Sequence, residues 1–160
     1  MIAVVILNWN GVDMLRRYLP GVVSDCAGEG EVIVADNGST DDSLHYLHTE
    51  HPDVRLVCFD QNLGFAGGYN AAFRRIEQET PGRYDYYLLL NSDVRTSPGW
   101  LTPMRTYMDA HPETAAAQPK IHAEWAHDSF EHAGAAGGFI DRFGYPFLFI
   151  SYSAFPLAGI

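Results

Sequence analysis

Polar side chains that could bind a ligand follow three apolar runs of the sequence. They are Asn8 and Asn10 after the first run, Asp36 after the second, and Asn91, Ser92 and Asp93 after the fourth. A carboxylate at such a position can accept directional hydrogen bonds from a uracil or thymine imide or from a ribose hydroxyl. The alternative for Asp36 is that it only shapes the turn that follows it. The sequence alone leaves both roles open.

Asp93 is a carboxylate directly after an apolar strand, where an uncharged turn is usual. Such a group suits a hard cation, Mg²⁺ or Mn²⁺, that bridges two phosphates, and Asn91 could support the ion. One carboxylate cannot hold the ion alone, so a diphosphate and water must supply most ligands. The alternative is an ordinary turn residue close to a helix.

A glycine-rich segment, NLGFAGGYNAAF, begins at Asn62 and contains Gly64, Gly67 and Gly68. Glycines let a backbone approach a ligand closely, and a helix that starts nearby would direct free N–H groups at a diphosphate. The segment fits neither the dinucleotide fingerprint nor the P-loop pattern. A structural turn is therefore an equal alternative when the segment is considered by itself.

Alternating strands and helices must position these residues. Apolar runs predict four strands, at residues 2–7, 31–36, 54–59 and 86–90. Helical spacing of apolar residues predicts a helix after each strand. A capping box from Ser39 to Asp42 would open the second helix; Ser97 would cap the fourth, with Pro98 as its first residue and Tyr107 on its buried stripe. This order predicts a mainly parallel sheet with ligands at the carboxyl ends of the strands.

Composition bounds the class of protein. The chain has 160 residues, of which 47% are apolar, enough for one globular core. Its net charge of -10 argues against a nucleic-acid partner, because phosphate-backbone binding is driven by Lys and Arg. Cys26 and Cys58 are isolated and have no metal-ligand spacing, which predicts free thiols in a cytoplasmic protein. A disulfide between them is the alternative.

Four segments, NWNG, ADNGSTDDS, NLGFAGGYNAAF and LLLNSDV, occur in this order between Met1 and Lys120. The series resembles glycosyltransferase family 2, in particular its bacterial rhamnosyltransferase-like members. The resemblance implies a GT-A (Rossmann-like) α/β fold, a three-layer α/β/α sandwich, truncated here. It implies that residues 1–121 form a nucleotide-sugar-binding core and that residues 122–160 begin an incomplete acceptor-side region.

The resemblance also implies a set of substrate-binding residues. They are Leu7, Asn8, Asn10, Asp36, Asn62, Gly64, Gly67, Asn91, Ser92 and Asp93. Asn8 and Asn10 would lie beside the base, and Asp36 would bind the base or the ribose. The sequence NSD stands in place of the family's DXD motif, so Asp93 would bind Mn²⁺ or Mg²⁺. Asn91 replaces the first acid of that motif, which makes metal binding weaker or more dependent on the donor.

The activity implied is inverting transfer of a sugar from a UDP- or dTDP-sugar to a hydroxyl of a saccharide or lipid-linked acceptor, in cell-surface polysaccharide synthesis. The family's general base has no counterpart before Ile160, so this chain is expected to bind donor but to transfer sugar poorly. The alternative is a non-catalytic nucleotide-binding module. The uncharged segment 143–160 favours it, because that segment could drive self-association into a homo-oligomer. We expect a cytoplasmic location, with peripheral attachment to the inner face of the membrane as the alternative.

Overall fold

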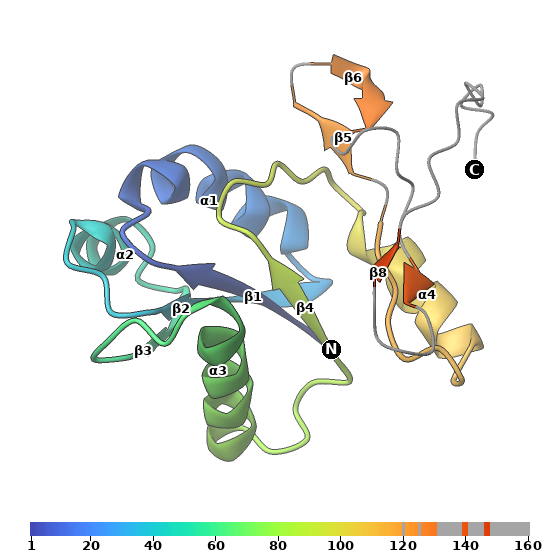
Figure 1. Cartoon of the computed structure of the whole chain (residues 1–160), viewed down its shortest axis with the longest axis horizontal. Coiled ribbons are helices and arrows are strands. Elements are labelled where there is room, and N and C mark those ends of the chain that lie inside the picture. Colours follow the sequence, from blue (N-terminus) through green and yellow to red (C-terminus); the bar gives the residue numbers. More distant parts are fainter. Residues whose placement is uncertain (120, 125, 131–138, 141–145, 148–160) are drawn as a thin grey trace. The chain divides into compact units, whose positions relative to one another are not determined.

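The computed structural model describes residues 1–119, 121–124, 126–130, 139–140 and 146–147 (Figure 1). Contacts divide the chain into two compact units, Met1–Arg105 and Thr106–Ile160. All the candidate site residues belong to the first unit. The functional division at residues 121 and 122 stays a prediction.

The first unit is built on a four-stranded sheet. Its strands are β1 (Ile2–Asn8), β2 (Gly30–Asp36), β3 (Arg55–Cys58) and β4 (Tyr86–Leu90). They are parallel and lie in the order β3-β2-β1-β4. This confirms the predicted parallel sheet, with β3 shorter than expected. Because all four strands run in one direction, their carboxyl ends meet at the same edge of the sheet.

Helices cover both faces of this sheet. They are α1 (Val12–Cys26), α2 (Ser43–Glu50) and α3 (Phe65–Glu79); a fourth helix, α4 (Leu101–Ala110), begins in the first unit and ends in the second. Figure 1 shows α1 and α2 on one face and α3 on the other. Side chains alternate along a strand, so Val4 and Ile6 join the core under α1 and α2, whereas Ala3 and Val5 join the core under α3. The predicted three-layer α/β/α architecture is confirmed.

Two helix starts differ from those expected. The fourth helix begins at Leu101 rather than at Pro98, because residues 97–100 form a turn in which the Trp100 amide donates to the Ser97 carbonyl at 3.3 Å. Tyr107, predicted to be buried, is 51% exposed. Leu101, which is fully buried, anchors the helix instead.

The predicted capping box at Ser39 is also wrong. Asp42 occupies the N-cap of α2, and its side chain makes no capping hydrogen bond. The Ser39 hydroxyl accepts hydrogen bonds from the Asn8 side chain and the Asn10 amide, at 3.1 and 2.9 Å. Ser39 is therefore engaged with the end of β1 and cannot cap α2.

Both cysteines are free, as predicted. Cys26, the last residue of α1, is buried, and this burial raises the pKa of its thiol to about 11. Cys58 is exposed at the end of β3. Neither residue supports a disulfide.

The second unit contains short antiparallel strand pairs: β5 (His122–Ala123) with β6 (Ala126–Phe130), and β7 (Phe139–Ile140) with β8 (Pro146–Phe147). Apart from residues 146–147, the uncharged segment 143–160 lies outside the described residues. Among the helices in the described part of the chain, none is both long and apolar enough to cross a bilayer.

Candidate functional site

The ends of β1, β2 and β4 form the candidate site. Asn8 at the end of β1 lies opposite Asp36 at the end of β2, and Ile6 lies opposite Leu90, the last residue of β4. A β-carbon on Gly11 would lie 2.6 Å from Asn8 Oδ1 and 3.9 Å from Ser92 Oγ. The end of β1 therefore lies beside the end of β2, and the segment after β1 lies close to the segment after β4.

The Asp36 carboxylate is engaged within the protein. It is 1% exposed, accepts from Asn8 Nδ2 at 3.0 Å through one oxygen, and accepts from the Ser39 amide at 2.9 Å through the other. The turn-shaping role that the sequence left open is thus present. An ionised carboxylate has about four acceptor positions, so these two bonds leave capacity for a ligand donor.

Asn8 is fully buried, and its Oδ1 is an acceptor without a hydrogen-bond partner in the described structure. The donors of its amide are both used, by Asp36 and Ser39. Leaving a buried acceptor unpaired costs about 1–3 kcal/mol. A hydrogen-bond donor brought to this atom would remove the cost; that Asn8 lies beside the base stays a prediction.

Asn10 ties the first loop to the second. It is exposed and adopts a left-handed backbone conformation, with φ of 50°. Its Oδ1 accepts from the Thr40 and Asp41 amides at 2.7 and 3.3 Å, and its own amide donates to Ser39 Oγ. These bonds hold the loop after β1 against the loop after β2.

Asp41 extends this connection to α1. Its Oδ2 accepts from the Val12 amide in the first turn of that helix, at 3.0 Å, and its Oδ1 accepts from the Ser43 amide, also at 3.0 Å. Burial opposes ionisation, but the hydrogen bonds from Ser43 and Val12 outweigh it and lower the pKa of the carboxyl. A carboxylate at a helix N-terminus is also favoured by the helix dipole.

The glycine-rich segment borders the same edge of the sheet. Asn62 Oδ1 accepts from the Gly64 amide at 2.7 Å and from the Asn37 side chain at 3.0 Å. Gly64 is the N-cap of α3, which has no side-chain cap, and Gly67 lies in its exposed first turn. Leu7 is half-buried, and its side chain packs against the backbone of Gly68. Sequence reasoning missed Asn37, whose only signal was its place in a turn dipeptide.

Asn91 and Asp93 are exposed, and Ser92 is half-buried. Within the described residues, no group of three or more His, Cys, Asp or Glu side chains could hold a metal ion. A cation at Asp93 would therefore need further oxygen ligands, which a bound diphosphate and the Asn91 side-chain oxygen could supply.

Tyr69 is a second residue that the sequence did not reveal as part of the site. It lies on the inner face of α3 and is 3% exposed. Its hydroxyl donates to the Leu90 carbonyl at 2.9 Å, directly before Asn91. Burial raises the pKa of this phenol. The hydroxyl thus links α3 to the segment that carries Asp93.

Replacing Tyr69 by phenylalanine should lower the free energy of unfolding by about 1 kcal/mol, because it removes one buried hydrogen bond and keeps the ring. Urea denaturation measures this change. Tyr107→Phe is the matched control, since Tyr107 is largely exposed and should lose its hydroxyl without effect. Equal stability of the Tyr69 variant and the parent would show that the bond contributes nothing.

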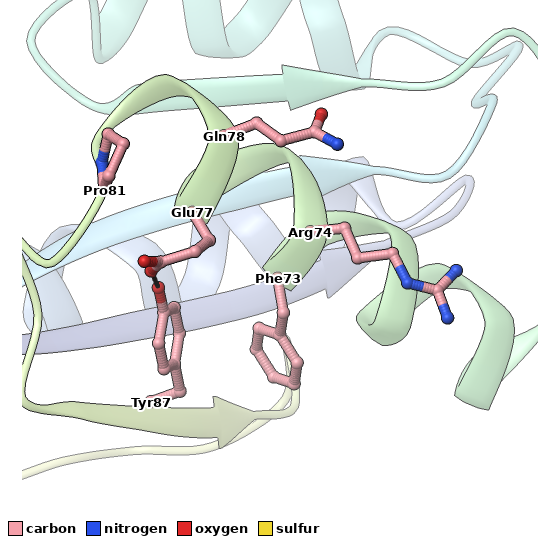
Figure 2. A pocket seen from close by; sticks show the side chains of 6 residues that line it. All are labelled: Phe73, Arg74, Glu77, Gln78, Pro81 and Tyr87. Carbon is pink, nitrogen blue, oxygen red and sulfur yellow. Dashed lines mark hydrogen bonds between the residues drawn. The ribbon is translucent and has the colours of Figure 1, made fainter.

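A surface hollow between α3 and β4 contains none of the candidate site residues. It has a volume of about 530 Å³ and is lined by Phe73, Arg74, Glu77, Gln78, Pro81 and Tyr87. Figure 2 shows the rings of Phe73 and Tyr87 side by side, with the Tyr87 hydroxyl bonded to Glu77 at 2.8 Å. Burial, followed by this contact, raises the pKa of Tyr87 to about 12. The hollow is thus separate from the strand-end site.

Comparison with known proteins identifies the family. The model of glycosyl transferase family 2 matches residues 3–154. The chain belongs to this family. The first 119 residues, which the structure describes without a gap, contain all four motifs on which the resemblance rests.

Relatives of this family 2 chain include rhamnosyltransferase sequences. The N-acetylglucosaminyl-diphospho-decaprenol L-rhamnosyltransferase of Mycobacterium tuberculosis is 25% identical over 126 residues, covering 76% of this chain and 41% of the relative. An uncharacterised glycosyltransferase of Nostoc is 33% identical over 75 residues, covering 45% of this chain and 23% of the relative. The chain therefore spans less than half the length of these relatives.

Solved structures share the fold. TarS of S. aureus in complex with UDP-GlcNAc has a TM-score of 0.57 and 16% identity, covering 77% of this chain and 38% of TarS. The mannosyltransferase PcManGT of Pyrobaculum calidifontis, in complex with GDP-Man and Mn²⁺, has a TM-score of 0.50 and 17% identity, covering 76% and 33%. At this identity the likeness concerns the fold, which is the predicted GT-A arrangement.

Proposed function

We propose that this chain is the donor-binding part of an inverting glycosyltransferase that uses a UDP- or dTDP-sugar. The acceptor is a hydroxyl of a saccharide or of a lipid-linked saccharide, in cell-surface polysaccharide synthesis. The observation that carries the proposal is the meeting of Asn8, Asp36 and Ser92 at one edge of a family 2 fold. The mycobacterial relative is a rhamnosyltransferase named for a lipid-linked acceptor, and TarS has been solved with UDP-GlcNAc; both support this choice.

The negative charge of the site favours donor binding that depends on a metal ion. The four segments 8–11, 36–43, 58–68 and 91–94 contain no Lys or Arg, and their acidic residues are Asp36, Asp41, Asp42, Asp60 and Asp93. A diphosphate placed among these carboxylates would be repelled unless a divalent cation and backbone N–H groups offset the charge. The Mn²⁺ bound in PcManGT is consistent with this requirement in a protein of the same fold.

The residues of this chain would act as follows. Asp93, with Asn91, would hold Mn²⁺ or Mg²⁺ against the diphosphate, where the ion stabilises negative charge on the leaving group. Asn8, Asn10 and Asp36 would line the base and ribose. Asn62, Gly64 and Gly67 would border the diphosphate at the start of α3. We propose no catalytic base among the described residues.

The division of labour along the chain is part of the proposal. Residues 1–121 would bind the donor, and residues 122–160 would begin the acceptor side. The match with the mycobacterial rhamnosyltransferase covers 41% of that relative's length. We therefore propose that acceptor recognition needs more than the residues of the donor-binding core. We propose that it acts in the cytoplasm or at the inner face of the membrane.

Binding of UDP or dTDP with Mn²⁺ should raise the melting temperature. A ligand at about one hundred times its dissociation constant adds roughly 2.7 kcal/mol to the free energy of unfolding. Differential scanning fluorimetry measures the shift, with EDTA in place of metal as one control and GDP as a test of base selectivity. If no nucleoside diphosphate stabilises the chain in the presence of metal, the site assignment is wrong. A sugar-transfer assay with the same chain then tests whether it acts as an enzyme or only as a binding module.

A further inference from the structure

Asn37 connects two loops of the proposed donor site. It is 2% exposed, although it lies in the turn after β2. Its Oδ1 accepts from the Leu63 amide at 2.9 Å, and its Nδ2 donates to Asn62 Oδ1 at 3.0 Å and to the Gly64 carbonyl at 3.2 Å. The two polar atoms of one side-chain amide therefore bond, together, to three consecutive residues of the glycine-rich segment.

These bonds reach the first turn of α3. The Gly64 carbonyl that accepts from Asn37 also accepts from the Gly68 amide, at 2.9 Å, as the first hydrogen bond of the helix. Asn62 Oδ1 accepts from both Asn37 and the Gly64 amide, so the same oxygen joins the two loops. Asn37 consequently links the start of α3 to the end of β2.

Close packing on both sides of Asn37 keeps this arrangement fixed. A β-carbon on Gly38 would lie 2.6 Å from the Gln61 carbonyl carbon, and one on Gly68 would lie 3.1 Å from Asn37 Nδ2. A side chain does not fit at the first distance, and at the second the Asn37 amide would have to shift. The two loops are therefore in contact at backbone level, and the amide of Asn37 lies between them.

We infer that Asn37 is a positioning residue for the donor: its side-chain amide holds the Asn62–Gly64 segment in the conformation that binds the nucleotide sugar. This inference rests on the proposed function. Both polar atoms of the Asn37 amide are already bonded to this segment, so its effect passes through Asn62 and Gly64 rather than through contact with ligand. Without these bonds the segment would have several conformations, and ordering one of them on binding would weaken the affinity.

Asn37→Ala and Asn37→Asp provide two levels of disruption. Alanine removes all three bonds. Aspartate keeps the acceptor for the Leu63 amide but places a carboxylate against Asn62 Oδ1 and the Gly64 carbonyl. We expect both variants to raise the Kd for UDP or dTDP with Mn²⁺ at least tenfold, measured by calorimetric titration of the folded full chain. Gln78→Glu is the matched control, since it makes the same amide-to-acid change at an exposed position of α3 and should bind like the parent.

Hydrogen exchange tests the mechanism without nucleotide. The Leu63 amide should exchange faster in the Asn37→Ala variant, because its acceptor is gone, whereas amides within β1 should be unchanged. A double-mutant cycle with Asn62→Ala adds a readout that general destabilisation would not reproduce. The Kd of the double variant should equal the higher of the Kd values of the two single variants, because both substitutions act through the same contact. Additive losses would overturn the inference.

The outcomes separate the inference from the function on which it rests. Faster loop exchange with unchanged nucleotide affinity would overturn the positioning role and leave the proposed function standing. Unchanged exchange in a folded Asn37→Ala variant would show that the three bonds do not hold the segment, and would also overturn it. Failure of the parent chain to bind any nucleoside diphosphate would overturn the proposed function, and the positioning role with it.

Discussion

Replacing Asp93 by alanine should abolish the metal-dependent part of nucleotide binding. Asp93 is exposed after β4, and the described residues offer no cluster of three acidic or histidine ligands that could replace it. If the cation is held between this carboxylate and the diphosphate, removing the carboxylate leaves mainly phosphate and water as ligands. The stabilisation of roughly 2.7 kcal/mol expected at saturating nucleotide and Mn²⁺ should then fall to the value measured in EDTA.

The effect should be confined to the liganded state. Asp93 is on the surface, where substitutions usually change the free energy of unfolding by less than about 0.5 kcal/mol. The melting temperature of the variant without ligand should therefore match that of the parent. Asp53→Ala is the matched control, because it removes an exposed carboxylate from the loop between α2 and β3. A Mn²⁺-dependent shift of the same size in the Asp93 variant and the parent would contradict the assignment of the metal position.

The strands and their parallel arrangement were predictable because each strand is marked by a continuous apolar run of its own residues. Residues 2–7 and 31–36 are continuous apolar runs, and both are buried on two faces of a parallel sheet. Parallel pairing with helical crossovers then brings the carboxyl ends together without further information. Thus the juxtaposition of Asn8 with Asp36 followed from the sequence, although their hydrogen bond did not.

The helix starts were less predictable because several residues compete to begin a helix. Ser39 and Ser97 both have the residue type of an N-cap, yet Ser39 accepts from Asn8 and Asn10, and Ser97 closes a turn with Trp100. The contacts of Ser39 are tertiary, whereas the contact of Ser97 depends on the local turn. Propensity alone cannot decide between a cap and such a partner.

The missed site residues act across long separations in the chain. Asn37 bonds to Asn62 and Gly64, which are 25 and 27 residues further along, and Tyr69 bonds to the Leu90 carbonyl 21 residues further along. The spacing of neighbouring residues does not predict such long-range contacts. Their residue types were visible, but only the packing of α3 against the sheet shows what their polar groups bind.

Replacing Asp36 by alanine should affect both stability and binding. The carboxylate is 1% exposed and is the acceptor for Asn8 Nδ2 and the Ser39 amide. Leaving a buried donor unpaired costs about 1–3 kcal/mol. The substitution leaves two donors without this acceptor, one N–H of the buried Asn8 amide and the Ser39 amide. We therefore expect the free energy of unfolding, measured by urea denaturation, to fall by about 1–3 kcal/mol.

Nucleotide binding separates Asp36 from Asp93. If Asp36 contacts the base or ribose, Asp36→Ala should weaken binding of UDP or dTDP equally with Mn²⁺ and with EDTA, because the base and ribose lie away from the cation. Asp36→Asn keeps the size of the side chain and one acceptor, so it should retain more stability while still placing an amide where a carboxylate is required. Calorimetric titration below the melting transition keeps unfolding out of the measurement. A folded Asp36→Asn variant with the affinity of the parent would leave Asp36 with its turn-shaping role alone.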